Sequence, residues 1–365
     1  MPLTRRQERI LAEVRVRGRV DATQLAAREG VSAMTVRRDL RGLDDAGLVR
    51  RVHGGAVPVD YRPSTGIPST GRKRAADPAT DSTLFTLGLC VPDAEYYFPH
   101  VVAGAVDQAS ALGGRVVLAF SRYETTREQD QIRRLVANGV DGLLVATAEI
   151  EAPGTLELLS AVEIPSVLLE RSAHAGPPQA GLESVRSDHD LGAAMAVEHL
   201  NSLGHRVIAH AVLDTHSSTA VRAGYLRELA RGGLTEHSLV EPGPWPPLRE
   251  RTHDVIDALL ACRATAVCVH PDWYALELVE ALGERGVSVP DDISVVAHDD
   301  VVAAHADVPL TAIAPPKMEV GRFATTMLVE RLSTLGGPAF PLRHLTLAPA
   351  LVVRDSTAPV AGGGE

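Results

Sequence analysis

The chain has 365 residues, of which 45% are hydrophobic and only 4% are aromatic, and its formal net charge is −10 at pH 7. This length exceeds one ordinary domain and the apolar content supports sizeable cores, so two or three domains are expected. No stretch approaches the ~18 consecutive apolar residues of a membrane span, and the opening MPLTRRQERI lacks the apolar segment of a signal peptide. These features predict a cytoplasmic protein without a membrane partner.

The charge is divided unevenly along the chain. Residues 1–56 carry 12 Lys and Arg against 7 Asp and Glu, whereas residues 84–365 carry 20 against 36. A basic N-terminal unit joined to an acidic body is the asymmetry expected when one end of a protein binds a polyanion.

Residues 1–56 are predicted to form three short helices and a β-hairpin. The first helix is expected over residues 4–17 and the second from Thr23 to Gly30, which is a favourable residue for ending a helix. Ser32 is a good N-cap for the third helix, because its hydroxyl can accept from free backbone N–H groups of the first turn. This helix spaces three apolar residues four and three apart, which predicts their burial: Val36, Leu40 and Leu43.

The opposite face of the third helix is basic and suited to the DNA major groove. A strand over residues 48–52, returning through Gly54 and Gly55, would add a wing. The predicted DNA contacts on the two elements are Ser32, Met34, Thr35, Arg37, Arg38, Arg41, Arg50, Arg51 and His53. A solvated helix face or a winged helix that docks protein is the alternative.

These residues also carry a family resemblance. RRQERIL, VDATQLAAREGVSAMTVRRDL and LDDAGLVRRVHGGAV resemble successive parts of the winged helix-turn-helix of DeoR-type transcription regulators. The resemblance implies that VSAMTVRRDL is a DNA-recognition helix. The following residues, 57–83, are rich in Pro, Ser, Thr and Gly and are predicted to be a flexible linker.

From residue 84 onward, short apolar runs alternate with amphipathic segments, which is typical of parallel sheets covered by helices on both faces. Strands are predicted at 85–91, 114–120, 141–147, 166–170, 206–213, 266–270 and 293–300. Two such doubly wound units in series predict a two-lobed binding protein. Polar groups at the carboxyl ends of the strands should line the cleft between the lobes.

Enzyme and metal chemistry find little support in the sequence. No Gly-rich phosphate loop, GxSxG or HExxH motif is present, and a scattered histidine such as His210 or His298 is more often a structural polar residue than a ligand. The three cysteines, Cys90, Cys262 and Cys268, lie in apolar contexts without a CxxC spacing, which predicts buried, reduced thiols. No catalytic residue, cofactor or metal site is therefore predicted.

The body resembles the regulatory core of LacI/GalR-type regulators, which is similar in fold to periplasmic sugar-binding proteins. The most specific segments are VPDDISVVAHDD and the PLTAI that follows it. The resemblance implies a two-lobed effector domain over residues 84–357 and a disordered tail over 358–365. It also implies three crossings between lobes, near 183–186, 312–316 and 343–346, so that lobe 1 comprises 84–183 and 316–343 and lobe 2 comprises 186–312 and 346–357.

The resemblance further implies a sugar cleft. Its expected ligand contacts are Phe98, Glu170, Arg222, Trp245, Asp272 and Asp299. The alternatives are core packing for Trp245, a surface pair of Glu170 with Arg171, and a helix N-cap for Asp299. The family usually has Asn where Pro271 stands, so one sugar contact is lost or is replaced by His270 or Asp272.

The predicted function is a ligand-responsive transcription regulator, a repressor of carbohydrate metabolism or transport genes. It would bind an operator in double-stranded DNA as a homodimer, with a tetramer as the alternative, and a sugar or sugar derivative as effector. LacI/GalR-type regulators usually carry a different helix-turn-helix and a hinge helix, which this sequence lacks, so coupling is expected to depend on the placement of two wings or on the linker. A sugar-binding or sugar-processing protein without a regulatory role is the alternative function.

Overall fold

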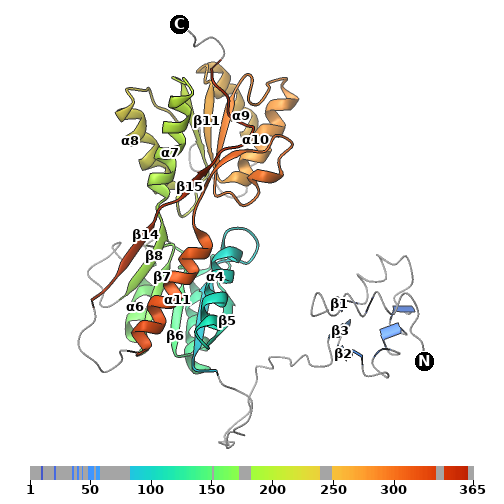
Figure 1. The fold of residues 1–365 in the computed structure, drawn as a ribbon, viewed down its shortest axis with the longest axis vertical. Helices are drawn as coiled ribbons and strands as arrows, with labels where there is room; N and C mark the ends of the chain where they lie inside the picture. Colours follow the sequence, from blue (N-terminus) through green and yellow to red (C-terminus); the bar gives the residue numbers. More distant parts are fainter. Residues whose placement is uncertain are drawn as a thin grey trace, which may run out of the picture. The chain divides into compact units, whose positions relative to one another are not determined.

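A computed structural model describes residues 83–149, 152–171, 182–238, 249–333 and 341–360, together with 10, 20–21, 35–36, 39–40, 43, 48–52 and 55–57 near the N-terminus. The chain divides into two compact units, Met1–Pro78 and Ala79–Glu365, and the division falls inside the segment predicted to be a linker (Figure 1).

The N-terminal unit contains the predicted wing. Strands β2 (Arg50–Val52) and β3 (Gly55–Val57) pair antiparallel, with Val52 opposite Gly55, and β1 (Val20–Asp21) pairs with the other edge of β3. The apolar residues predicted to be buried on the third helix are buried, since Val36, Leu40 and Leu43 are at most 2% exposed. Among the predicted DNA contacts, Thr35 is half-buried and Arg50 and Arg51 belong to β2. The others lie outside the described residues: Ser32, Met34, Arg37, Arg38, Arg41 and His53.

The first lobe of the larger unit is a six-stranded parallel sheet in the order β14-β8-β7-β6-β4-β5. Its strands are β4 (Thr86–Val91), β5 (Arg115–Phe120), β6 (Gly142–Val145), β7 (Ser166–Leu169), β8 (Glu183–Ser187) and β14 (His344–Leu347). One face packs against α4 (Phe98–Ala111) and α11 (Lys317–Ser333), and the other against α5 (Thr125–Ala137) and α6 (Pro153–Ala161) (Figure 1). Apolar residues on both faces of the central strands explain this double covering.

The second lobe is a mixed six-stranded sheet in the order β10-β9-β11-β12-β13-β15, in which only the edge strand β15 runs antiparallel. Its strands are β9 (Ile208–Val212), β10 (His237–Ser238), β11 (Ala266–His270), β12 (Ser294–His298), β13 (Thr311–Ala314) and β15 (Ala350–Val352). Helices α7 (His189–Ser202) and α8 (Ser218–Arg231) cover one face (Figure 1). Helices α9 (Arg249–Ala261) and α10 (Asp272–Glu284) cover the other face, and a 3-10 turn, η1 (Ala303–His305), follows β12.

The first and third crossings between lobes lie later than predicted. Residues 184–187 of β8 pair with residues 344–347 of β14 in the first sheet, so the chain crosses only after Ser187 and after Leu347. These strands are short and mix polar with apolar residues, so their sequences resemble those of the loops that connect two lobes. The middle crossing, between Ala314 and Lys317, falls close to its predicted place.

The predicted disordered tail begins too early. Ala358 donates its N–H to the Ser294 hydroxyl over 3.1 Å, and its carbonyl oxygen lies 3.0 Å from Nε2 of His205. Val360 donates its N–H to the carbonyl of Leu203. Residues 358–360 are therefore held to the second lobe, and 361–365 lie outside the described residues.

Candidate functional site: a polar cluster between two sheets

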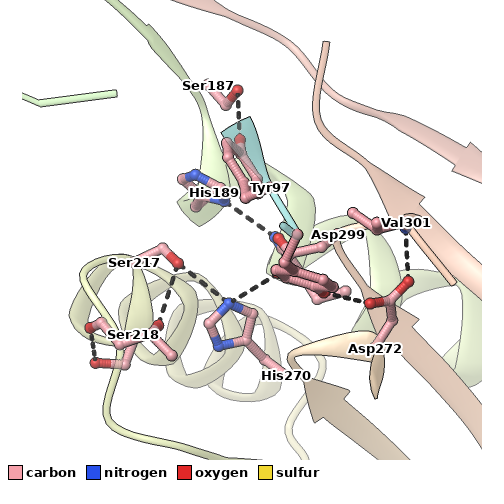
Figure 2. Close-up of polar contacts among 12 residues, drawn as sticks. Tyr97, Ser187, His189, Ser217, Ser218, His270, Asp272, Asp299 and Val301 are labelled. Carbon is pink, nitrogen blue, oxygen red and sulfur yellow. Dashed lines mark hydrogen bonds and ion pairs between the residues drawn. The ribbon is translucent and has the colours of Figure 1, made fainter. Parts of the chain in front are cut away.

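Polar side chains from both lobes meet where the strands of the two sheets end (Figure 2). The carboxyl ends of first-lobe strands supply Tyr96 and Tyr97, in the loop between β4 and α4, together with Glu170 and Ser187. The second lobe supplies His189, His270, Asp272, His298 and Asp299, each at the start of a helix or the end of a strand. Hydrogen bonds join the two groups, so the predicted gathering of polar groups between the lobes is confirmed.

Asp272 is the most firmly held carboxylate of this cluster. Its Oδ2 accepts hydrogen bonds from three successive backbone N–H groups, those of Val301 (2.6 Å), Val302 (2.7 Å) and Ala303 (3.0 Å). Its Oδ1 accepts from the hydroxyl of Tyr96, which crosses from the other lobe. With Asp272 at the first turn of α10, the helix N-terminus also favours its negative charge.

Asp299 lies beside it and shares the same tyrosine. The Tyr96 hydroxyl is 3.2 Å from Oδ2 of Asp299, and Nε2 of His270 is 3.7 Å from that oxygen. Burial, assisted by the negative charge of Asp272, raises the pKa of Asp299 to about 6, although His189 and Lys317 act in the opposite direction. Burial and the two carboxylates raise the pKa of Tyr96, so its hydroxyl stays protonated and acts as a donor.

Glu170 organises the first lobe's side of the cluster. Its two oxygens accept from the Ser187 N–H and Ser187 hydroxyl, both at 2.8 Å, and from the Tyr97 hydroxyl at 2.9 Å. Burial by itself would raise its pKa, but the hydrogen bond and charge of His189, with the bonds from Ser187, outweigh that effect and lower it. Glu170 is therefore ionised, and its position is fixed by three donors.

Two of the histidines in the cluster are neutral. Burial lowers the pKa of His270 and His298 well below the ordinary value, and the repulsion that a second protonated histidine nearby would cause lowers it further. His270 shares a hydrogen bond of 3.1 Å with Ser217, and Nδ1 of His189 lies 3.2 Å from Nε2 of His298. At neutral pH, His270 and His298 therefore act as uncharged donors and acceptors.

Two buried cations border the cluster. Lys317 donates from Nζ to the carbonyl of Asp299 and lies 5.2 Å from the ring centroid of Tyr97. Arg171 donates to the carbonyls of Thr147 and Glu170, with the shortest contact 2.8 Å. Because Glu170 and Arg171 are both buried, the alternative that they form a surface pair is wrong.

The structure brings together only some of the predicted effector contacts. Glu170, Asp272 and Asp299 lie in the cluster, whereas Phe98 packs in the apolar core against the edge of the Tyr97 ring. Arg222 does not join them, because its side chain is 45% exposed and pairs with Glu236 on the surface of the second lobe over 3.1 Å. Trp245 lies outside the described residues.

Sequence reasoning missed six residues of the cluster or its border: Tyr96, Tyr97, Ser187, His189, Lys317, and His298, which it treated as a structural polar residue. The two tyrosines immediately precede Phe98, so the correct loop was identified but the wrong aromatic residue. A signal was available, since a tyrosine at a strand end offers a hydroxyl that a phenylalanine lacks.

Comparison with known proteins matches each unit to a family. Residues 6–61 match the DeoR-like helix-turn-helix domain, and residues 197–357 match the periplasmic binding protein-like domain. The chain joins a DeoR-like DNA-binding domain to a periplasmic binding protein-like domain. This confirms the combination that the sequence predicted, and the α/β architecture of the larger unit agrees with it.

Proteins similar to this chain include transcriptional repressors and regulators. An arabinose metabolism transcriptional repressor of Geobacillus stearothermophilus is 27% identical over 347 residues, which cover 92% of this chain and 90% of the relative. The HTH-type transcriptional repressor PurR of Photobacterium profundum is 27% identical over 75% of this chain and 82% of its own length. A LacI family transcriptional regulator from Enterococcus faecium, solved with bound ribose, superposes with a TM-score of 0.61 at 25% identity, over 76% of this chain and all of that one. The predicted regulator function agrees with all three.

Proposed function

We propose that this chain is a ligand-responsive transcriptional repressor that binds an operator through its DeoR-like domain and a sugar in the cleft of its larger unit. The observation that carries the proposal is the union, in one chain, of a DNA-binding domain and a two-lobed domain whose strand ends gather buried carboxylates. The repressor from Geobacillus stearothermophilus, which is similar along both units, supports a role in pentose metabolism.

The polar cluster is chemically suited to a polyhydroxylated effector. Ionised carboxylates accept hydrogen bonds from sugar hydroxyls, and hydrogen bonds to charged groups are the stronger ones. Asp272 and Asp299 now bind the Tyr96 hydroxyl, which is the same chemical group that a sugar would present. We therefore expect an effector hydroxyl to replace that of Tyr96 on one or both carboxylates.

DNA binding is assigned to the third helix and the wing of the N-terminal unit, with Arg38 and Arg51 as the leading contacts. Two such units in a homodimer would bind two half-sites and supply the specificity that one winged helix lacks. The edge strand β5 supports a dimer, since it exposes 38% of Val117 and 40% of Leu118 at the end of the first sheet.

Within the described residues no helix is long and apolar enough to cross a membrane. A cytoplasmic site of action is part of the proposal, since the operator lies there. The relatives above are regulators rather than enzymes, and we propose no catalytic activity for this chain.

The test is carried out in two stages with the full chain. Selection from a pool of random DNA duplexes should enrich a two-fold symmetric sequence, and the selected duplex then serves in titrations with arabinose, ribose, xylulose and their phosphates. At least one sugar should change the affinity for this duplex. Failure to enrich any duplex would contradict the regulator assignment, whereas enrichment without a sugar effect would contradict the effector assignment alone.

Three variants locate the effector site. Asp272→Asn should weaken binding of the active sugar at least about tenfold, because one hydrogen bond to a charged acceptor contributes about 1.5–3 kcal/mol. Arg222→Ala distinguishes two expectations. The family resemblance implies that this variant loses sugar binding, whereas the structure, in which Arg222 lies outside the cluster, implies that it does not. Arg285→Ala, in an exposed pair with Asp257, controls for the loss of a surface arginine.

A further inference from the structure

Two histidines of the cluster face each other with the geometry of metal ligands. His189 begins α7 and His298 ends β12, and Nδ1 of the first lies 3.2 Å from Nε2 of the second. Two zinc–nitrogen bonds of about 2.0–2.1 Å that span this separation enclose an angle of about 100°, close to the tetrahedral value. The separation of the two nitrogens is therefore short enough for both to bind one ion, and the rings, whose centroids are 5.4 Å apart, need only a small rotation toward it.

A third ligand lies beside the pair. Asp299 follows His298 directly, and one ligand atom from each of the three residues falls within 4.8 Å of the others. Asp299 is only 3% exposed, and its Oδ1 has no hydrogen-bond partner in the described part of the chain, although its Oδ2 faces Tyr96 and His270. A buried carboxylate oxygen without a hydrogen-bond partner destabilises the fold, and a bound ion or ligand would remove this cost.

We propose that His189, His298 and Asp299 bind one divalent transition-metal ion, with zinc as the best fit. Two imidazole nitrogens and one carboxylate oxygen are a ligand set that zinc accepts, and three protein ligands leave the fourth tetrahedral position open. The proposal goes beyond the sugar-responsive function, because the ion is bound by the chain's own residues and needs no sugar.

Supporting residues orient these ligands. The second nitrogen of His189, Nε2, faces Oε2 of Glu170 at 3.8 Å, and Glu170 is itself fixed by Ser187 and Tyr97. A carboxylate on the far nitrogen of a metal-bound histidine is the common arrangement, because it sets the tautomer and the ring orientation. Tyr96 and His270 hold Asp299 from the side of its other oxygen.

The charges around the cluster also favour a cation. The cluster contains three carboxylates, those of Glu170, Asp272 and Asp299. Among the described residues, only two buried cations border it, Lys317 and Arg171. Lys317 is directed to the backbone carbonyl of Asp299, which leaves the carboxylate free to bind the ion.

A hydrogen bond between the two imidazoles is the simpler explanation of the 3.2 Å contact. That explanation accounts for the histidine pair but leaves Oδ1 of Asp299 buried without a partner. A bound ion accounts for both observations. Sequence reasoning gave no metal site because the two histidines are 109 positions apart and belong to no spaced motif.

The experiment titrates the full-length, tag-free chain, stripped of metal by a chelator, with Co²⁺ in the absence of any sugar. One Co²⁺ per chain should bind with the visible absorption of a tetrahedral site, and Zn²⁺ should displace it. His189→Gln and His298→Gln should each weaken Co²⁺ binding by more than about 100-fold, since even a residue that only supports a ligand contributes about 10–100-fold. Ser187→Ala, which loosens Glu170, should have the smaller effect.

His100→Gln, at an exposed position on α4, is the matched control and should bind Co²⁺ as the wild type does. Circular dichroism of each variant reports on folding, and His189, with a side chain 12% exposed, tolerates substitution better than the buried His298. Octahedral or substoichiometric Co²⁺, or tetrahedral Co²⁺ retained in His189→Gln, would overturn the proposal. None of these three results would affect the sugar titrations, which test the repressor function separately.

Discussion

The surroundings of His210 predict that this histidine lowers the stability of the fold at acidic pH. It lies in β9, is 1% exposed and stacks on the ring of Tyr225 at 4.4 Å, and neither of its ring nitrogens has a hydrogen-bond partner among the described residues. Burial, assisted by the charge of Arg222, lowers its pKa from 6.5 to about 3. The folded protein therefore keeps this ring neutral, whereas the unfolded chain takes up a proton below about pH 6.5.

The sign and size of the effect follow from this difference. Because the folded pKa lies below the unfolded one, stability is lost as the pH falls from about 6.5 toward 3, by about 1.4 kcal/mol per pH unit for each proton. Replacing His210 by Leu removes the proton site. The free energy of unfolding of His210→Leu relative to wild type should therefore rise by about 2 kcal/mol between pH 7.5 and pH 5.0.

Urea unfolding of the full chain at the two pH values, with a chelator present, measures this difference. His305→Leu, at an exposed position in η1, controls for the removal of a histidine as such. The other histidines are present in both wild type and variant, and only the two whose pKa the charge of His210 also lowers, His270 and His298, add a smaller part to the difference. A difference between His210→Leu and wild type that stays constant from pH 7.5 to 5.0 would show that His210 is not held neutral in the fold.

Three further predictions concern DNA recognition and packing. Arg38→Ala should reduce the preference for the selected duplex over random DNA by about 1–3 kcal/mol, as measured by fluorescence anisotropy. Arg51→Ala should weaken binding to the selected duplex and to random DNA alike, and the slope of log K against log salt concentration should become smaller by about 1. Glu183→Gln should lower the free energy of unfolding by about 2–3 kcal/mol, because this buried carboxylate accepts from Arg343 at 2.7 Å and Arg331 at 3.2 Å; an unchanged urea midpoint would contradict it. Gly104→Ala should cost about 1–3 kcal/mol in the same assay, because its Cβ would lie 2.0 Å from the carbonyl oxygen of Met318 where α4 packs on α11.

Sequence patterns located seven of the twelve described strands of the larger unit, because parallel strands buried on both faces are continuous apolar runs. The predicted 266–270 coincides with β11, and the predicted 85–91 differs from β4 by one residue. The strands β8 and β14 were missed at the lobe crossings, since ESVRS and HLTL carry polar residues and form one edge of the first sheet. Such strands depend on their neighbours rather than on their own composition.

The site was predicted less completely, for a physical reason. Asp272 and Asp299 each follow a buried strand, and that local pattern was sufficient to select them. Tyr96 and His189 acquire their roles only when two sheets face each other, because the partners of Tyr96 are 176 and 203 positions away. Arg222 was selected from a short motif on α8, and such a motif does not determine which side of the helix faces the cleft.

The bonds made by Tyr96 also constrain how an effector can act. Its hydroxyl lies on the first lobe and its two acceptors lie on the second, so this one group helps to hold the lobes together. A sugar that takes over Asp272 and Asp299 must break that link and replace it with contacts of its own, and only the difference between the two sets of hydrogen bonds contributes to its affinity. Under the proposed function, a sugar that also reaches Glu170 and Ser187 on the opposite side would retain the lobe arrangement, and a sugar that does not would change it. Effector identity and the direction of the response would then be linked through the same few hydrogen bonds.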